Sequence, residues 1–134
     1  MPTQLSPEAR AYLSELRFGV LATINSDGTP QLTTMWYELQ GDEIMMNTKA
    51  SRLKDHNLRR DPRVALCVED GYRYVTLTGA VRLTDDQATA QADIKRLATL
   101  YHGAERADQM VASQFAREQR VTIRMAIERV SEHW

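Results

Sequence analysis

The chain has 134 residues, of which 43% are hydrophobic and 26% are charged, and its formal net charge at pH 7 is -1. This length and composition favour one globular domain over residues 1–134, and the near-neutral charge argues against a general nucleic-acid-binding protein. The single cysteine, Cys67, excludes an intramolecular disulfide. The sequence has no signal peptide, no apolar run of the roughly 20 residues that a membrane span needs, and no metal-ligand spacing, so we expect a cytoplasmic protein without metal or membrane contact.

The first part of the sequence predicts a helix and then three strands. The order Ser6, Pro7, Glu8 is typical of a helix start, with a cap followed by a first-turn proline and acid. Turn residues such as Asp27-Gly28 separate the apolar runs that follow. We therefore expect three consecutive antiparallel strands over residues 18–24, 31–39 and 43–48.

The rest of the sequence predicts three more strands and two helices. The strands are expected over residues 64–70, 72–83 and 120–130, and the last two alternate apolar and polar side chains. A capping box led by Thr84 predicts a long helix after it, and residues 107–117 predict another. Six antiparallel strands with covering helices indicate a small, closed β barrel.

A basic stretch, KASRLKDHNLRRDPR, spans residues 49–63 and holds six of the chain's 17 Lys and Arg residues. Ser51 is expected to cap a helix that ends before Pro62, since proline disfavours helical geometry in its predecessor. Arg52 and Lys54 would lie at the N-terminus of this helix, where cations oppose the helix dipole. A bound phosphate would explain them. Residue chemistry alone leaves this phosphate site and an ordinary solvated helix face both open.

The sequence carries no signature of a side-chain catalyst. It lacks a dinucleotide-binding glycine motif, a P-loop and a nucleophile elbow, and no nucleophile adjoins its three histidines. An enzyme with this sequence would therefore take its chemistry from a cofactor. Aromatic residues that either stack on a planar cofactor ring or serve as core and dimer contacts are Trp36, Tyr37, Tyr72 and Tyr74.

The ordered segments LATINSDGTPQLTTMWY, NTKASRLKDHNLRRDPRVAL and YRYVTLTGAVRL resemble the split-barrel flavin and deazaflavin oxidoreductases, the pyridoxamine-phosphate-oxidase-like superfamily. Within it, the chain looks most like the branch that binds the deazaflavin coenzyme F-420 in place of FMN. The resemblance implies a mainly β fold with covering helices, built as a six-stranded antiparallel split β-barrel. It also implies a homodimer with two cofactor sites between the protomers.

The resemblance also implies which residues contact the cofactor. The family's phosphate motif falls on Thr48, Ser51, Arg52 and Lys54. The strand along the tricyclic ring would contribute Gln31, Thr33, Thr34 and Met35, and Tyr72 and Tyr74 would reach across from the partner subunit. The chain ends IERVSEHW, without the arginine-rich substrate motif of the true pyridoxamine-phosphate oxidases, so oxidation of pyridoxamine phosphate is not expected.

The function implied is hydride transfer from reduced F-420 to an unsaturated organic substrate, with solvent or a tyrosine such as Tyr37 as the proton source. An FMN-dependent oxidoreductase or flavin reductase of the same fold is the nearest alternative. A non-enzymatic protein that only binds F-420 or flavin is another. Nucleic-acid binding through the basic helix is disfavoured by the net charge.

Overall fold

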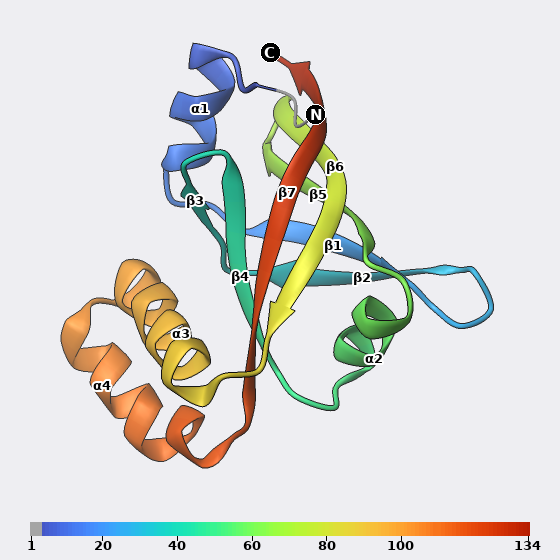
Figure 1. Ribbon diagram of the computed structural model, residues 1–134. Coiled ribbons are helices and arrows are strands. Elements are labelled where there is room, and N and C mark those ends of the chain that lie inside the picture. Colours follow the sequence, from blue (N-terminus) through green and yellow to red (C-terminus); the bar gives the residue numbers. More distant parts are fainter. Residues whose placement is uncertain (1–3) are drawn as a thin grey trace.

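The computed structural model describes residues 4–134, in which seven antiparallel strands form one sheet with helices at its periphery (Figure 1). In chain order the elements are α1 (Pro7–Ser14), β1 (Gly19–Ile24), β2 (Pro30–Met35), β3 (Glu38–Gln40), β4 (Glu43–Lys49), α2 (Leu53–Arg60), β5 (Arg63–Asp70), β6 (Arg73–Thr84), α3 (Gln87–His102), α4 (Ala104–Ser113), the 3-10 helix η1 (Phe115–Arg117) and β7 (Arg120–His133). The strand order in the sheet is β2-β1-β5-β6-β7-β4-β3. The expected mainly β fold with helices is therefore confirmed.

The expectation of six strands was wrong because the strand predicted over residues 31–39 is two strands. The chain leaves the ladder after β2, and the backbone N–H of Tyr37 donates to the side-chain hydroxyl of Tyr101 at 3.1 Å instead of to a neighbouring strand. β3 then pairs with β4. The predicted three-strand series holds in part, since β1 pairs with β2 and β3 pairs with β4. It is not one continuous series, because β2 and β3 lie at opposite edges of the sheet.

The sheet is open, which corrects the expectation of a closed barrel. Its two edge strands in the described chain are β2 and β3, and they do not pair with each other. The longest pairing joins β6 to β7 and contains an irregularity between Thr78 and Gly79. A Cβ atom at Gly79 would lie 1.8 Å from the carbonyl oxygen of Ala126, so only glycine allows this close approach of the two strands.

The main core lies on the inner face of the sheet. Its central side chains, such as Leu21, Leu66 and Leu77, are fully buried and alternate with half-exposed residues along β1, β5 and β6. The alternation arises because successive side chains of a strand point to opposite faces of the sheet. β4 and the first half of β7 are buried on both faces, because α3 packs against them. A second apolar cluster joins α3, α4 and η1 through Ile94, Ala98, Ala107 and Phe115. These helices form one wall of the site described below.

Helix α1 lies at one end of the sheet (Figure 1), and its Ala9, Tyr12 and Leu13 side chains belong to the main core. Ser6 caps it as expected, accepting a hydrogen bond from the backbone N–H of Ala9 at 3.0 Å. The buried Tyr12 hydroxyl bridges the carbonyl oxygens of Val68 and Arg73, each at 3.1 Å. α1 is therefore tied directly to the turn between β5 and β6.

The predicted capping box before α3 was displaced. Thr84 is the last residue of β6, and the helix cap is Asp86, whose carboxylate accepts a hydrogen bond from the backbone N–H of Thr89 at 3.2 Å. The extended pairing of β6 with β7 runs through Thr84 and keeps it out of the cap.

Candidate cofactor-binding site

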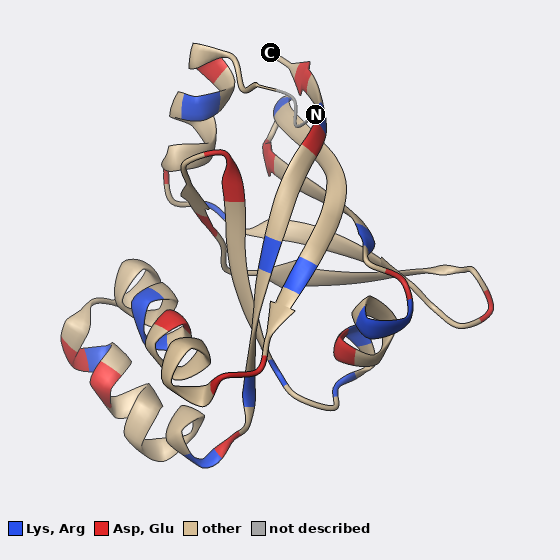
Figure 2. Cartoon of the chain, viewed as in Figure 1, with Lys and Arg blue, Asp and Glu red and all other residues tan. Residues whose placement is uncertain are grey.

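A pocket of about 310 Å³ lies between β2, β4, the start of α2 and the α3–α4 pair. Basic and polar side chains form one part of its lining, namely Thr48, Lys49, Arg52, Lys54, Asn47, Gln114 and Arg120. The remaining lining comes from Thr33, Thr34, Met35, Trp36, Ile94, Leu97, Met110 and Phe115. No carboxylate lines the pocket within residues 4–134, so its lining is positively charged. Figure 2 shows Lys and Arg segments where β4 ends, where β7 begins and along the chain into α2.

Strand register and one unusual backbone conformation bring the basic side chains together. The pairing of β4 with β7 places Lys49 opposite Arg120, although they are far apart in sequence. The chain then turns at Ser51, which has a φ of 70°, in the left-handed region. This reversal directs α2 back towards β4, so that the Lys54 ammonium reaches the Thr48 hydroxyl at 3.1 Å.

The expected helix cap at Ser51 was wrong. The N-cap residue of α2 is Arg52, and the Ser51 side chain is exposed and outside the pocket lining. The backbone N–H of Ser51 donates to the buried carboxylate of Asp55 at 2.8 Å. Asp55 thus holds the backbone just before the helix, and within residues 4–134 no side chain caps α2. The helix ends at Arg60, before Pro62, as predicted. The cofactor-binding role of Ser51 stays a prediction.

Lys54 is a buried cation without a carboxylate partner. Its residue is 6% exposed, and within residues 4–134 its ammonium forms one side-chain hydrogen bond, to Thr48, and no ion pair. Burial lowers the pKa of Lys54, and the nearby charges of Arg52 and Arg120 lower it further. Burying an uncompensated charge is costly, so this site favours an anion that would compensate it.

Arg120 also lines the pocket, and sequence reasoning missed it. Its side chain is buried, with Nε donating to Asn47 Oδ1 at 3.0 Å and Nη1 donating to Glu118 Oε1 at 2.8 Å. Burial lowers the pKa of Arg120, and the ion pair with Glu118 partly opposes this shift. Only the register of β4 against β7 reveals its position, and no short motif around residue 120 carries that information.

Some of the residues expected to contact the cofactor line the pocket, and others do not. Thr33, Thr34 and Met35 line the pocket, as do Thr48, Arg52 and Lys54 of the expected phosphate motif. Gln31 does not, because its side-chain oxygen accepts hydrogen bonds from Thr23 at 3.0 Å and Asn57 at 3.3 Å, which ties β2 to α2. The structure thus brings six of the ten predicted residues into one pocket.

Tyr72 lies in the turn between β5 and β6, and Tyr74 lies at the start of β6, both outside the pocket lining. Tyr72 is 92% exposed, and Tyr74 stacks on His133 with ring centroids 4.8 Å apart. Their expected reach into a partner subunit's site stays a prediction.

An aromatic stack supports the apolar wall. The Trp36 ring lines the pocket and stacks on Tyr101, with centroids 5.4 Å apart and ring planes 16° apart. Tyr101 stacks in turn on Phe18. The Tyr37 hydroxyl instead lies in the core, where it donates to the Leu13 carbonyl oxygen at 3.1 Å and where burial raises its pKa. Tyr37 therefore does not fit the expected role of proton source.

The described part of the chain shows no metal site and no membrane-spanning helix. Across residues 4–134, no group of three or more His, Cys, Asp and Glu side chains is arranged to hold a metal ion. Within the same residues, no helix has both the length and the apolar character that crossing a membrane requires.

Comparison with known proteins supports a flavin- or deazaflavin-binding oxidoreductase family for this open antiparallel sheet and its basic pocket. The family described as "Pyridoxamine 5'-phosphate oxidase" matches residues 5–134, and the chain belongs to this family.

Solved structures agree with this assignment. The chain is similar to a conserved hypothetical protein from Mycobacterium tuberculosis, with 31% identity and a TM-score of 0.79 over 98% of this chain and 86% of the other. It is also similar to an F-420 reductase, with 27% identity and a TM-score of 0.77 over 95% of this chain and 98% of the other. A putative pyridoxamine 5'-phosphate oxidase from Listeria innocua, at 18% identity and a TM-score of 0.67 over 93% and 94%, shares the fold.

Proposed function

We propose that the protein is an F-420-dependent reductase that passes a hydride to an unsaturated organic substrate. The observation that carries this proposal is the pocket itself, in which a buried lysine and two arginines lie beside an aromatic and aliphatic wall. Such a lining suits a ligand that has a phosphate at one position and a planar ring at another. The similarity to an F-420 reductase supports the same assignment.

The basic residues fit the phosphate of this coenzyme. Arg52 makes no side-chain hydrogen bond or ion pair within residues 4–134, and Lys54 has only the Thr48 hydroxyl. Both cations therefore have donors available for phosphate oxygens. The Thr48 hydroxyl would add a third donor close to the Lys54 ammonium.

The remaining lining would hold and shield the ring. Thr33, Thr34 and Met35 present one strand edge to the pocket, and Trp36 contributes a flat apolar surface. Ile94, Leu97, Met110 and Phe115 keep water from the opposite side. When bound, the reduced deazaflavin supplies the hydride, and the chain's task is to bind and orient it. Solvent remains as the proton source, because the Tyr37 hydroxyl lies in the core.

A homodimer in the cytoplasm is part of the proposal. The outward face of β2, β1 and β5 carries two cross-strand rows without a charged side chain, namely Leu32, Ala22 and Ala65, and Thr34, Val20 and Cys67. Leu32 is 66% exposed in the single chain. A second copy packed on this face would cover these side chains, and Tyr72 and Tyr74 would approach the partner's pocket.

The decisive experiment is a parallel titration of the purified protein with F-420 and FMN, monitored by tryptophan emission. We expect F-420 to bind more tightly and to quench the emission. A Trp36→Phe variant identifies the reporting residue, since Trp134 remains in it. A protein that purifies yellow with bound FMN would overturn the deazaflavin assignment in favour of the flavin alternative.

Turnover is measured separately as the oxidation of reduced F-420 in the presence of enones and quinones. We expect consumption of reduced F-420 with at least one unsaturated acceptor. Tight binding with no turnover across the panel would identify a coenzyme-binding protein instead of a reductase.

A further inference from the structure

We propose that Arg120 is a third phosphate-binding residue, which completes an anion site with Arg52 and Lys54. The inference rests on the proposed function, because it extends the expected phosphate motif to a residue at the start of β7. Neither the motif around residues 48–54 nor any pattern near residue 120 indicates this role. The positions of three cations around one pocket carry it.

The first observation is that Arg120 is buried and yet lines the pocket. Its residue is 6% exposed, and it lies where β7 pairs with the end of β4. Buried arginines are normally fully paired, because desolvating a guanidinium is costly. The surroundings of Arg120 lower its pKa, mainly by burial and in part through the positive charge of Arg52.

The second observation is that only part of the guanidinium is paired. Nε donates to Asn47 Oδ1 and Nη1 donates to Glu118 Oε1, whereas Nη2 has no hydrogen bond within residues 4–134. The ring of Phe115 lies 4.9 Å from the guanidinium carbon and supports one face of the plane. The side chain is therefore held in place with one amino group still available to a ligand in the pocket.

The third observation is an excess of positive charge. Lys49, Arg52, Lys54 and Arg120 all line the pocket. Within residues 4–134 their one carboxylate partner is Glu118, which lies 3.8 Å from Lys49 and 2.8 Å from Arg120. The nearby carboxylate of Asp55 does not neutralise these cations, because its oxygens accept hydrogen bonds from the Ser51 backbone and from Arg59. One carboxylate against four cations leaves a surplus that a phosphate ester would neutralise.

The ligand chemistry follows from these donors. The Arg120 guanidinium, the Lys54 ammonium and the Thr48 hydroxyl line one pocket from different elements, and a tetrahedral phosphate would offer each of them an oxygen. A planar carboxylate has two oxygens and would leave part of this donor set unpaired. The structure therefore assigns the basic part of the pocket to a phosphate group, bound from both β7 and α2.

The test compares ligands that differ only in the phosphate-bearing arm. We would measure the affinity of wild type and Arg120→Gln for F-420 and for 8-hydroxy-5-deazariboflavin, which has the ring and no phosphate. Losing one charge-assisted hydrogen bond is expected to weaken F-420 binding by about tenfold to a hundredfold. The affinity for the phosphate-free ring is expected to stay unchanged.

The matched control is Arg82→Gln, which removes one positive charge from an exposed arginine of β6 that pairs with Glu43 outside the pocket. It is expected to leave both affinities unchanged. If Arg120→Gln weakens both ligands equally, or neither of them, Arg120 serves only the fold and the proposal is overturned. If Arg120→Gln does not fold, Arg120→Lys carries the test, with a smaller selective loss expected, because lysine keeps the charge and lacks the second amino group.

A second probe separates this inference from the proposed function. Inorganic phosphate, added at constant ionic strength, should raise the midpoint of thermal unfolding of wild type and Arg82→Gln more than that of Arg120→Gln. This result would support the anion site even if F-420 does not bind at all. Equal stabilisation of all three proteins by phosphate would overturn it.

Discussion

At the scale of single residues, Lys54 links the electrostatics of the pocket to ligand binding. Burial and two neighbouring arginines lower its pKa from the ordinary value of 10.5, so the free protein loses this charge earlier than an exposed lysine would. A bound phosphate would stabilise the protonated form and raise the pKa again. Binding is therefore coupled to proton uptake by Lys54.

This coupling predicts that affinity for a phosphate-bearing ligand falls as the pH rises towards 10.5. The measurement is the ratio of the affinities for F-420 and 8-hydroxy-5-deazariboflavin at increasing pH, in which titration of the shared ring cancels. Lys54→Arg should move the decline to higher pH, because an arginine keeps its proton. A ratio that stays flat in wild type would show that Lys54 does not bind the phosphate.

The same residue predicts a conflict between stability and function. Native Lys54 binds its proton more weakly than the unfolded chain does, so its contribution to the free energy of unfolding is unfavourable below the native pKa and improves as the pH rises. Lys54→Met keeps the length of the side chain and removes the buried charge. At neutral pH we expect it to leave the free energy of unfolding unchanged or to raise it by up to roughly 4 kcal/mol.

Denaturant unfolding measures this change, with Lys95→Met as the control. Lys95 is an exposed lysine of α3 that pairs with Asp108, and its replacement should change stability by less than about 0.5 kcal/mol. Lys54→Met should also lose the preference for ligands with a phosphate. A clear loss of stability would mean that Lys54 is a structural residue.

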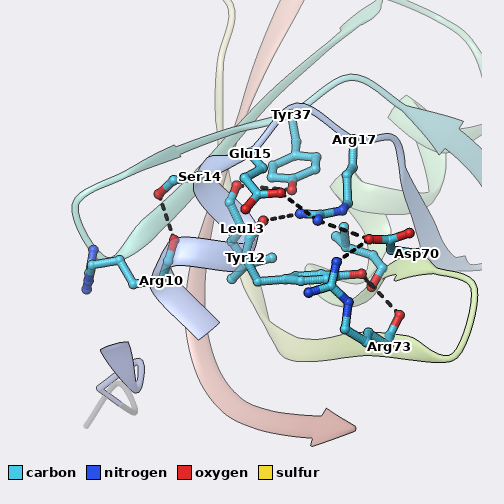
Figure 3. Close-up of polar contacts among 10 residues, drawn as sticks. Arg10, Tyr12, Leu13, Ser14, Glu15, Arg17, Tyr37, Asp70 and Arg73 are labelled. Carbon is cyan, nitrogen blue, oxygen red and sulfur yellow. Dashed lines mark hydrogen bonds and ion pairs between the residues drawn. The ribbon is translucent and has the colours of Figure 1, made fainter. Parts of the chain in front are cut away.

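At the scale of elements, the attachment of α1 depends on one buried hydroxyl, whose single proton is shared between two carbonyl oxygens. Tyr12 donates to the carbonyl oxygens of Val68 and Arg73, and the Arg17 guanidinium lies 3.8 Å from the centre of the Tyr12 ring (Figure 3). Asp70 forms ion pairs with both Arg17 and Arg73, and Arg17 in turn lies over the Tyr12 ring, so these four side chains form one connected group. The helix and the β5–β6 turn are thereby fixed to each other.

This arrangement predicts that Tyr12→Phe lowers the free energy of unfolding by about 1–3 kcal/mol, because the carbonyl oxygens of Val68 and Arg73 lose their donor while the ring is kept. The control is Tyr72→Phe, the same substitution at a side chain that is 92% exposed. It should change stability by less than about 0.5 kcal/mol. Equal effects of the two substitutions in denaturant unfolding would exclude a specific role of the Tyr12 hydroxyl.

Elements were predictable where a local signal decides them. The N-cap of α1 depends on Ser6, and the end of α2 depends on Pro62. Both effects reach only a few residues along the chain. The division of β2 from β3 was not predictable, because it depends on a distant residue. The hydroxyl of Tyr101, on α3, accepts a hydrogen bond from the backbone N–H of Tyr37. Arg120 was missed for the same reason, since its place in the pocket follows from the long-range pairing of β4 with β7.

At the scale of the whole molecule, one face of the sheet packs against the core, and the opposite face is partly exposed along β2, β1 and β5. Cross-strand neighbours on the outward face of β2, β1 and β5 are small or apolar, and β2 is also an edge strand. Exposed edges and apolar faces of this kind are normally covered or charged in a monomer. The proposed homodimer would cover this face and bring a second chain close to β2, which lines the pocket.

The proposal predicts that wild-type protein sediments at twice the 15.3 kDa mass of the chain. Leu32→Lys places a charge on the outward face and should shift the protein to the monomer mass, because burying that charge in the interface would be costly. Leu100→Lys is the matched control at another exposed leucine, on α3, and should leave the dimer intact. If the dimer completes the site, Leu32→Lys should also weaken F-420 binding, although Leu32 does not line the pocket. A monomeric wild type that binds F-420 fully would instead show that one chain makes the whole site.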